Sequence, residues 1–403
     1  MTEPDILSPF VETHGVTVYQ GDCIETMRRL PEASVNAIIT DPPYGLEFMG
    51  REWDGFGTPL GFQTWTEAWS REALRVLKPG GHLLAFAGTR TYHRMASGVE
   101  DAGFEVRDCI AWMYGSGFPK SLDVSKAIDR VAGAERERYA RAAFGKTFSD
   151  DNGTTYGGAL SDTPATPDAV KWSGWGTALK PAYEPIVIAR KPLTGTVAQN
   201  VLEHGTGALN IDATRIAGNV PCVTQGVNSN GSGYKVETTA QQSNPHAAGR
   251  WPANVVLDET AGAILDEQSG ERAPGANPPK RGLGSATVYG EANRTGVDRD
   301  RVQLDGGGAS RFFYCAKASK KDRNTNGASN THPTVKPTEL MRWLIRLVTP
   351  PGGIILDPFG GSGSTGVAAQ AESVRCILIE REAQYLAIIR ERLDDGSLFS
   401  QLP

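Results

Sequence analysis

The sequence has few cysteines and no long hydrophobic run, and each absence excludes a class of protein. Its 403 residues include five cysteines, which are scattered and never stand in a C-x-x-C pattern. A disulfide framework and a zinc site are therefore not expected, and a reducing cytoplasm fits the composition. The six histidines form no cluster, so no metal site is expected. No run of about 18 apolar residues occurs, and no membrane span is predicted.

Positive charge is also scarce, because 41 lysines and arginines face 46 acidic residues, for a formal net charge of −5. This deficit argues mildly against nucleic-acid binding, which needs cationic contacts with phosphates, but a local patch matters more than the total. Two segments could form such a patch, and a solvated surface explains each equally well. They contain Lys126, Arg130, Arg136, Arg138, Arg141 and Lys146 in one case, and Arg311, Lys317, Lys320, Lys321 and Arg323 in the other.

Short apolar runs alternate with helical periodicity at both ends of the chain. In the first part, buried strands are expected at 16–19, 35–40, 83–87 and 106–112. The last part repeats the rhythm, with strands expected at 354–356 and 376–379 and with Pro337 at the first position of a helix. This alternation predicts an α/β fold with a mostly parallel, twisted sheet and helices on both faces.

The middle of the chain, about residues 116–310, has a different composition. It is rich in Gly, Ser, Asn, Thr and Pro, and residues 226–233 carry almost no structural signal. One apolar segment, Pro185–Ala189, is expected to be a short strand. We interpret the middle as an insertion that carries recognition rather than as part of the sheet. A partly disordered linker is the alternative.

A glycine-rich loop, DPFGGSGST at residues 357–365, follows an expected strand in the last part. Its three glycines permit positive φ and close backbone approach, and Ser364 or Thr365 can cap the next helix. A strand, glycine loop and helix at the carboxyl edge of a sheet bind nucleotide-like ligands. Glu380 ends the next expected strand, 23 residues after Asp357, where an acid can accept hydrogen bonds from both hydroxyls of a ribose. The loop lacks the Gly-Lys-Ser/Thr ending of a P-loop.

A second motif, Asp41-Pro42-Pro43-Tyr44, follows the expected strand at 35–40. The residue before a proline is extended, so the two prolines hold the Asp41 carboxylate and the Pro42 carbonyl rigidly as acceptors. Hydrogen bonds to them from the two N–H groups of an exocyclic amine would free the nitrogen lone pair for attack on a methyl donor. Tyr44 can stack on a base that has turned out of its duplex. A turn with two prolines and a core tyrosine is the alternative, which the glycine loop disfavours.

Together these motifs resemble those of the S-adenosylmethionine-dependent DNA amino-methyltransferases, which modify cytosine N4 or adenine N6. Their order is similar to that of the permuted β group, with the catalytic motif first and the cofactor motif last. The resemblance implies a Rossmann-like methyltransferase fold with circularly permuted motif order. Residues 1–115 and 311–403 would form the catalytic and cofactor-binding domain, and 116–310 a target-recognition insertion. It also implies that the chain ends lie close together.

The resemblance further implies roles for individual residues. Asp41, Pro42, Pro43 and Tyr44 would be catalytic, and the segment Ala178–Pro185 would border the pocket for the target base. The residues expected to bind S-adenosylmethionine are Asp22 at the adenine ring, Thr334, Lys336, Asp357, Phe359, Gly361, Gly363 and Ser364 toward the methionine part, and Glu380 at the ribose.

Asp at position 41 favours adenine N6 as the acceptor, since the N4-cytosine members often carry Ser there. We therefore expect methyl transfer from S-adenosylmethionine to adenine N6 in double-stranded DNA, by base flipping and direct in-line attack. The alternatives are cytosine N4, an RNA or protein amide, and a non-catalytic DNA-binding relic of a methylase. A homodimer and a cognate restriction nuclease, or no nuclease as in an orphan or phage enzyme, are left open.

Overall fold

The structure is a computed structural model of the chain, and it divides into two compact units. A main unit comprises Met1–Gly115 and Tyr183–Pro403, and a small unit comprises Ser116–Ala182. The residues that the structure describes are 8–46, 54–117, 121–140, 148–149, 155–156, 160–218, 249–272, 275–276, 303–304, 306–316, 322, 324–325, 328–332 and 334–394.

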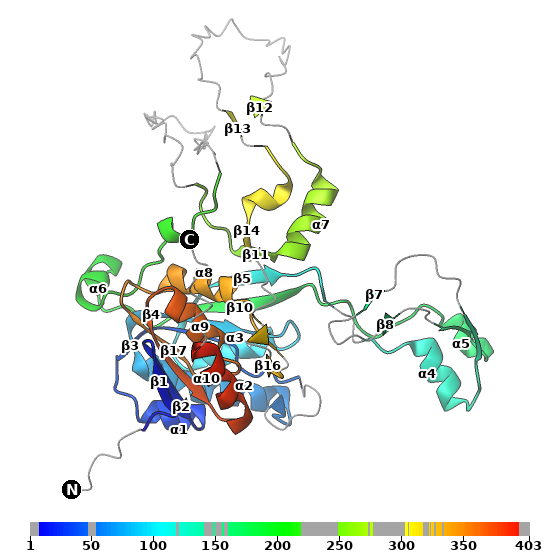
Figure 1. Cartoon of the computed structure of the whole chain (residues 1–403). Helices are drawn as coiled ribbons and strands as arrows, with labels where there is room; N and C mark the ends of the chain where they lie inside the picture. The colour runs from blue at the N-terminus through cyan, green and yellow to red at the C-terminus, as the bar shows by residue number, and fades with distance from the viewer. Residues whose placement is uncertain are drawn as a thin grey trace, which may run out of the picture. The chain divides into compact units, whose positions relative to one another are not determined.

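The main unit is built on a ten-stranded sheet in which spatial order differs from chain order (Figure 1). In order across the sheet, the strands are β1 (Val11–Thr13), β2 (Val16–Gln20), β18 (Arg375–Glu380), β17 (Ile354–Asp357), β3 (Val35–Thr40), β4 (Leu77–Phe86), β10 (Tyr183–Arg190), β5 (Glu105–Met113), β11 (Val255–Asp258) and β14 (Tyr314–Ala316). The run from β2 to β4 is parallel, as is the run from β5 to β14, whereas β1 and β10 are antiparallel to their neighbours. The predicted mostly parallel sheet is confirmed.

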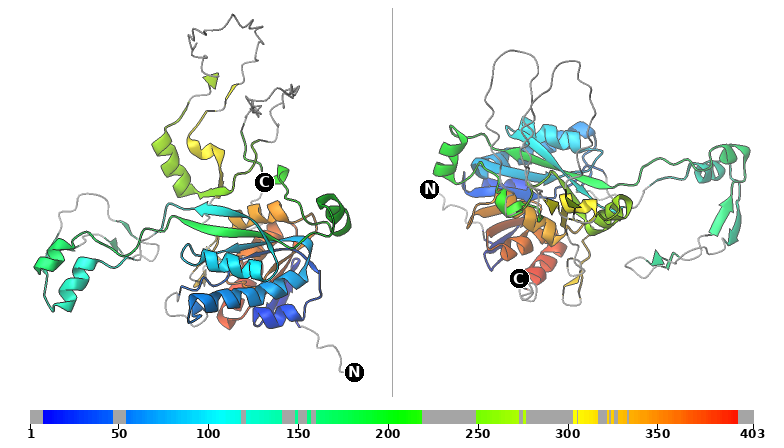
Figure 2. Two further views of the ribbon diagram at one scale, coloured as in Figure 1. Left: turned by 180° about the vertical axis from the view of Figure 1, so that it is seen from behind. Right: turned by 90° about the horizontal axis from the view of Figure 1, so that it is seen from above.

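Helices cover both faces of this sheet because its strands are apolar on both sides. On β3, Ile39 packs in one buried cluster with residues of α8 (Thr338–Val348), α9 (Ser364–Ala371) and α10 (Ala383–Asp394). Ile38 packs in the other with residues of α1 (Cys23–Arg28), α2 (Pro59–Val76) and α3 (Tyr92–Asp101). Figure 2 shows the blue and cyan helices on one face and the orange and red helices on the other. Pro337 is the N-cap of α8 rather than its first residue.

The remaining elements are short. In the main unit they are α6 (Val197–His204), α7 (Glu259–Ser269), the 3-10 helices η3 (Asp212–Thr214) and η4 (Ala309–Phe312), and the paired strands β12 (Gly275–Ala276) with β13 (Gln303–Leu304) and β15 (Asn324–Thr325) with β16 (Ala328–Ser329). Within the described ranges, none of the helices has both the length and the apolar character needed to cross a bilayer.

The strand order reverses within the sheet, between β17 and β3. From β17 the order continues through β18 to β2, and from β3 it continues to β4 in the opposite direction. β17 and β3 are parallel, with Leu356 opposite Ile38, so their carboxyl ends share one edge. Ligands of open α/β sheets bind at such a switch point. The glycine loop follows β17 and the Asp41–Tyr44 motif follows β3, so the fold brings the two motifs together.

The same order shows how the two ends of the chain meet. The last strands, β17 and β18, are inserted between β2 and β3, and α10 packs against β1 and β2. The Thr13 hydroxyl donates to Asp394 Oδ1 at 3.4 Å. The predicted closeness of the ends is therefore confirmed as far as the described residues reach, since 1–7 and 395–403 lie outside them.

One interpretation of the middle of the chain is wrong. Residues 116–310 do not all lie outside the sheet, because β10 lies between β4 and β5, and β11 pairs with β5. The strand expected at Pro185–Ala189 is present, and it sits deep in the core, since Ile186 packs on one face of the sheet and Val187 on the other. Of the two strands, β11 was not expected, because it is only four residues long within a glycine- and proline-containing stretch of sequence. The segment that forms a separate compact unit is 116–182, and residues 226–233 lie outside the described residues.

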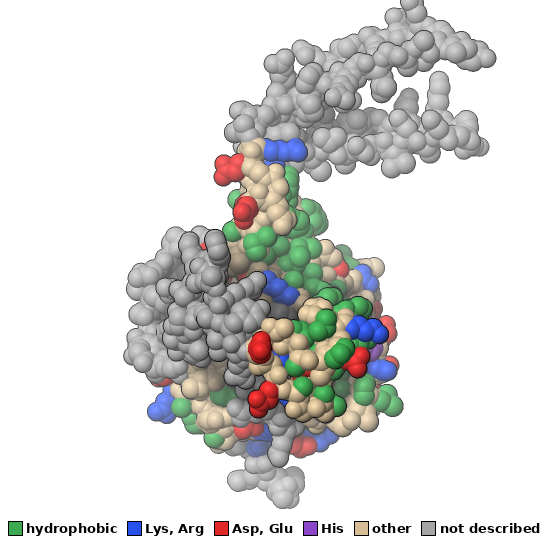
Figure 3. All heavy atoms as spheres, turned by 90° about the vertical axis from the view of Figure 1, so that its right-hand side faces the viewer, with side chains coloured by type: hydrophobic (Ala, Val, Ile, Leu, Met, Phe, Trp, Pro, Cys, Tyr) green, Lys and Arg blue, Asp and Glu red, His purple; other side chains and the backbone are tan. Residues whose placement is uncertain are grey.

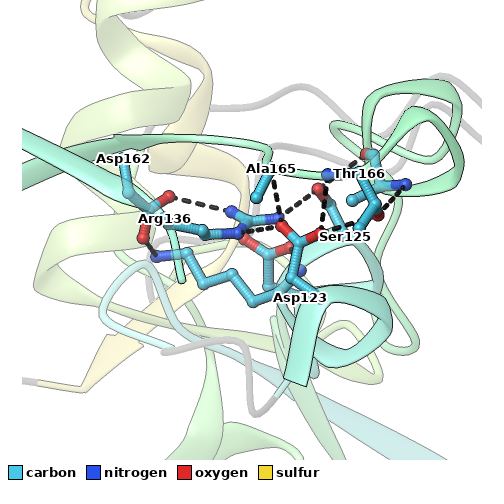
Figure 4. A network of polar contacts seen from close by, with 9 residues as sticks. Asp123, Ser125, Arg136, Asp162, Ala165 and Thr166 are labelled. Carbon is cyan, nitrogen blue, oxygen red and sulfur yellow. Dashed lines mark hydrogen bonds and ion pairs between the residues drawn. The ribbon is translucent and has the colours of Figure 1, made fainter. Parts of the chain in front are cut away.

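A polar network around Arg136 holds the small unit together (Figure 4). The unit contains α4 (Val124–Val131), α5 (Pro167–Lys171), and the strand pairs β6 (Glu137–Ala140) with β9 (Leu160–Thr163) and β7 (Phe148–Ser149) with β8 (Thr155–Tyr156). The Arg136 guanidinium donates to Asp129 at 2.6 Å and to Asp162 at 2.9 Å, and its side chain is 11% exposed. Arg136 is therefore a structural group rather than a free phosphate contact.

The two cationic segments consequently remain incomplete as patches. In the first, Lys126 pairs with Asp162 at 3.2 Å, while Arg141, Lys146 and the Arg138 side chain lie outside the described residues. In the second, the guanidinium of Arg311 donates to the Gly307 carbonyl at 2.8 Å, and its other basic residues lie outside the described ranges. On the face drawn in Figure 3, the described basic and acidic side chains are intermixed.

Candidate active site

A direct hydrogen bond joins the ends of β3 and β17. The Thr40 hydroxyl, at the end of β3, donates to Asp357 Oδ1 at 2.6 Å, and the Thr365 hydroxyl donates to Asp357 Oδ2 at 2.5 Å. Burial raises the pKa of Asp357 to about 6, against the opposing effect of these hydrogen bonds. Asp357 thus fixes the start of the glycine loop to the strand that carries Asp41.

The glycine loop lies close to its neighbours. Gly361 and Gly363 have φ values of +54° and +81°, which L side chains rarely adopt. A Cβ on Gly361 would lie 3.1 Å from His332 Nε2, and one on Gly363 would lie 3.3 Å from Ile389. Both the conformation and the space therefore require glycine here.

The expected cap of the helix after the loop is wrong. The N-cap of α9 is Gly363, which has no side chain, and no side-chain capping bond forms. Ser364 and Thr365 are inside the helix, where the Ser364 hydroxyl accepts from Arg392 at 3.1 Å and the Thr365 hydroxyl binds Asp357. The hydroxyl groups of both residues therefore serve other partners.

Glu380 faces the glycine loop from the end of the adjacent strand β18. Its Oε2 accepts from the Gly361 N–H at 2.7 Å, and its Oε1 accepts from the Glu382 N–H at 2.7 Å. Burial raises the pKa of Glu380 to about 7, although these two hydrogen bonds act in the opposite direction. Because each carboxylate oxygen has about two acceptor sites, both can still accept a hydroxyl group.

Three further predicted cofactor residues surround this edge. Asp22 follows β2 and caps α1, where its Oδ1 accepts from the Ile24 N–H at 2.9 Å. The neighbouring Gly21 N–H donates to the Glu380 carbonyl at 3.1 Å, so Asp22 lies one residue from a backbone bond to Glu380. Phe359 packs against Trp65 and Trp69, with ring centroids 5.5 Å apart in both pairs. The Thr334 side chain is exposed, and its carbonyl lies 2.7 Å from His332 Nδ1.

The Asp41–Tyr44 motif forms a polar cluster with two residues from elsewhere in the chain. The Tyr44 hydroxyl lies 2.8 Å from Asp41 Oδ1 and 3.0 Å from Glu184 Oε2. Burial and the two carboxylates raise the pKa of Tyr44 well above its ordinary value, so the hydroxyl keeps its proton at neutral pH. The Lys336 ammonium donates to Asp41 Oδ2 at 2.6 Å. Pro42 is buried and Pro43 is half-buried beside them.

Sequence reasoning missed several residues of this site. Glu184 belongs to the segment that resembled a border of the target-base pocket, but the residue itself gave no separate signal. Thr40 is the polar end of an apolar run, and only the pairing of β3 with β17 reveals its partner Asp357. His332 supports the loop from the side, since its ring packs on Tyr385 with centroids 4.5 Å apart and would meet a Cβ on Gly361.

Comparison with known proteins identifies the family. The DNA methylase family model, named for N6 and N4 methyltransferases, matches residues 35–391, which is most of the chain. The chain belongs to the DNA methylase family. It is therefore a DNA methyltransferase with a Rossmann-like α/β fold, and S-adenosylmethionine is its methyl donor.

Individual relatives are more distant. The Type II methyltransferase M.HindIII of Haemophilus influenzae is 26% identical over 278 residues, which cover 59% of this chain and 77% of the relative. The Type II methyltransferase M.HinfI, also of Haemophilus influenzae, is 26% identical over 110 residues, covering 24% of this chain and 31% of the relative. Similar solved structures include the cytosine-N4-specific PvuII DNA methyltransferase, with 14% identity, a TM-score of 0.43, and coverage of 96% of this chain and 91% of that chain. M1.HpyAVI has 15% identity, a TM-score of 0.40, and coverage of 94% and 98%.

The residues at the edge of the sheet suit S-adenosylmethionine. The loop offers backbone without side chains at Gly361 and Gly363, and a buried carboxyl at Glu380 with unused acceptor sites faces the loop. The Glu380 carboxyl suits a ribose, and the glycine backbone suits a small charged tail that lies directly against it. The bound cofactor supplies a methyl group on a positively charged sulfur.

Proposed function

We propose that this DNA methyltransferase modifies adenine N6 in double-stranded DNA. The observation that supports it most is that Asp41–Tyr44 and the glycine loop follow adjacent parallel strands joined by the bond between Thr40 and Asp357. Methyl donor and amine would then meet at one edge of the sheet. Asp at position 41 favours adenine over cytosine as the base.

In this proposal, the cofactor lies along the carboxyl edge from β17 to β2. Glu380 accepts hydrogen bonds from the ribose hydroxyls, and Asp22 lies at the adenine ring. The glycine loop contacts the methionine part together with residues at its start and on the preceding segment. These loop and segment residues are Asp357, Phe359, Gly361, Gly363, Ser364 and Thr334.

Asp41 and Pro42 would hold the amine of a base flipped out of the duplex. The Asp41 carboxylate and the Pro42 carbonyl accept its two N–H groups, which leaves the nitrogen lone pair directed at the methyl group. The Tyr44 ring stacks on the base while its hydroxyl remains bound to the carboxylates. Holding both reactants in line supplies most of the rate, and no covalent enzyme intermediate is needed.

We assign target recognition to the region 116–310, and in particular to the small unit. This unit is inserted in the chain between β5 and β10, and it exposes Trp172 and Trp175, whose rings pack 4.9 Å apart. Exposed aromatic side chains can stack on bases. Duplex DNA is the proposed partner and the cytoplasm the proposed location, and a homodimer or a cognate nuclease would be found by copurification.

Methyl transfer from labelled S-adenosylmethionine to duplex DNA tests the function. We expect label in the DNA of the wild type and none above background with Asp41→Ala. Asp101→Ala is the matched control, because Asp101 lies at the end of α3 and accepts from Gln63 at 2.8 Å, so transfer should persist. Mass analysis of the digested nucleosides should find N6-methyladenine. N4-methylcytosine would move the proposal to the other base, and a folded, cofactor-bound wild type that labels no DNA would refute it.

A further inference from the structure

Lys336 lies at the centre of the polar groups that follow β3. Its ammonium nitrogen is 2.6 Å from Asp41 Oδ2, 3.2 Å from Tyr44 Oη and 3.3 Å from Glu184 Oε2. An ammonium has three N–H donors, so these three acceptors satisfy it completely. The acceptors come from the turn after β3 and from β10, while Lys336 precedes α8. The cluster therefore depends on three distant parts of the chain.

Burial makes this pairing necessary. The Lys336 side chain is 7% exposed, compared with 18% for Asp41 and 22% for Glu184. A buried ammonium without counter-charges would be costly. Burial disfavours the ammonium, but the charges of Asp41 and Glu184 outweigh that effect and raise the pKa of Lys336. Its Nζ also lies 4.9 Å from the centre of the Phe86 ring, whose face attracts a cation. Lys336 thus remains a cation within the site.

Both oxygens of the Asp41 carboxylate are already bound. Oδ2 accepts from Lys336, and Oδ1 accepts from the Tyr44 hydroxyl at 2.8 Å. A carboxylate has about four lone-pair sites, so about two remain for an incoming N–H group. The carboxylate is therefore oriented before any substrate arrives, which is the arrangement that catalysis by orientation requires.

We propose that Lys336, with Glu184 as its second counter-ion, is a positioning residue that fixes the Asp41 carboxylate for the amine of the target base. This inference rests on the proposed function, because that function assigns the amine to Asp41. It differs from the family resemblance, which placed Lys336 near the methionine part of the cofactor. If Lys336 positions Asp41, its loss should lower kcat and spare the affinity for the cofactor. If Lys336 binds the cofactor, its loss should weaken that affinity.

The loss of Lys336 would leave two carboxylates around one hydroxyl. Tyr44 has a single hydroxyl proton, which it can donate to Asp41 or to Glu184 but not to both. The two like charges would then repel each other without the intervening cation. Asp41 would move from its position, and a displacement of about 1 Å can reduce a rate by roughly 100-fold.

Kinetics of Lys336→Met separate the two roles. With saturating S-adenosylmethionine and DNA, we expect kcat to fall about 100-fold. The Kd for S-adenosylmethionine, measured by calorimetry on the full chain, should stay within about threefold. Lys191→Met is the matched control, since that ammonium donates to the Leu77 carbonyl at 2.7 Å at the opposite edge of the sheet, and kcat should not change. An unchanged kcat with much weaker cofactor binding would overturn the inference.

A double-mutant cycle in the ligand-free protein tests the cluster without using activity. We expect Lys336→Met to lower the urea midpoint, and the further change Glu184→Gln to recover part of it, because it removes the uncompensated charge. Additive losses beside an active wild type would overturn this inference alone. A wild type that methylates no DNA would instead overturn the proposed function, while the cycle would still decide whether Lys336 and Glu184 are coupled.

Discussion

Glu380 shows how a single buried carboxyl can couple ligand binding to pH. Its pKa is raised to about 7 by burial, so a substantial fraction is protonated near neutrality. Protonation turns one carboxylate oxygen into an O–H donor and reduces the acceptor capacity of the group, so a ribose diol would be bound best above this pKa. The residue that sequence spacing alone suggested as a sugar ligand is therefore also a proton-sensitive group.

The affinity for S-adenosylmethionine should accordingly depend on pH. We expect its Kd to fall about 10-fold between pH 6 and pH 8 as Glu380 loses its proton. Glu380→Gln should weaken binding by roughly 1–3 kcal/mol at pH 8, because a charged acceptor is lost, and should flatten the dependence. Calorimetry at several pH values measures both effects. Equal wild-type and variant affinities at pH 8 would remove Glu380 from the cofactor site.

The same raised pKa affects folding with the opposite sign. In the unfolded chain the ordinary pKa of 4.5 applies, so between pH 4.5 and about 7 the native state holds a proton that the unfolded state has lost. The contribution of Glu380 to stability is therefore present at low pH and is lost as pH rises through this window, by about 3 kcal/mol. In urea unfolding of the ligand-free protein, Glu380→Gln should reduce this fall.

At the scale of residues, local motifs were predictable and their distant partners were not. Asp41, Tyr44, Gly361 and Glu380 stand in short patterns with a chemical meaning that spacing conveys. Lys336 was placed with the cofactor, yet its ammonium binds Asp41, 295 residues away in sequence. Nothing in either local pattern specifies that ion pair, because it depends on how β3, β10 and the segment before α8 converge.

The loop between β17 and α9 illustrates what an element contributes beyond its residues. Gly361 and Gly363 both have a positive φ, and a Cβ on either residue would be crowded by a neighbouring side chain. The effect of backbone strain can be separated from the effect of crowding, because a glycine in another turn of this chain has a similar positive φ but no close neighbour. Gly352, in the turn before β17, has a φ of +70° and no atom within 4 Å of a built Cβ.

Gly361→Ala and Gly352→Ala should therefore differ in their effect on binding. Each forces alanine into the left-handed region, and we expect each to destabilise the protein by about 1–2 kcal/mol. Only Gly361→Ala also displaces the His332 ring, so we expect its Kd for S-adenosylmethionine to rise at least 10-fold while Gly352→Ala leaves it unchanged. Urea unfolding and calorimetry measure the two quantities. Equal cofactor affinities would mean that the loop does not contact the cofactor.

Strands and helices were predictable where the sequence is rhythmic. The parallel strands from β2 to β4 and the helices between them follow apolar runs and spacings that are visible without coordinates. β11 was not predicted, because Val255–Asp258 is only four residues long and lies in a glycine- and proline-containing stretch of sequence. Such a short strand is stabilised by its neighbours β5 and β14 rather than by its own propensity.

The division of the whole molecule into units was only partly predictable from the sequence. The first boundary, near residue 116, agrees with the start of the small unit at Ser116, whereas the expected end at 310 lies far beyond Ala182. The composition of the sequence changes near the start of the small unit. It stays similar beyond residue 182, so it does not show where the chain returns to the main sheet. The chain returns to the main sheet at β10, which pairs with both β4 and β5.

Removal of the small unit should separate cofactor binding from DNA recognition. Met113 of β5 and Tyr183 of β10 are directly paired, so an Asn-Gly turn can join Gly115 to Tyr183 within the usual length of a hairpin loop. We expect this variant to fold and to bind S-adenosylmethionine as the wild type does. Its affinity for substrate DNA should fall at least 10-fold, measured by fluorescence anisotropy. Full methylation by the shortened protein would place target recognition elsewhere in the chain.

The position of β17 and β18 has a consequence for how the protein is made. β2 and β3 leave the ribosome well before β17 and β18, the two strands that fill the gap between them. Until β17 and β18 are made, the nascent chain exposes the unpaired edges of β2 and β3, which later lie inside the sheet. A product that stops before residue 354 would therefore lack the seam of its own sheet and should be a substrate for chaperones and proteases rather than a partly active enzyme.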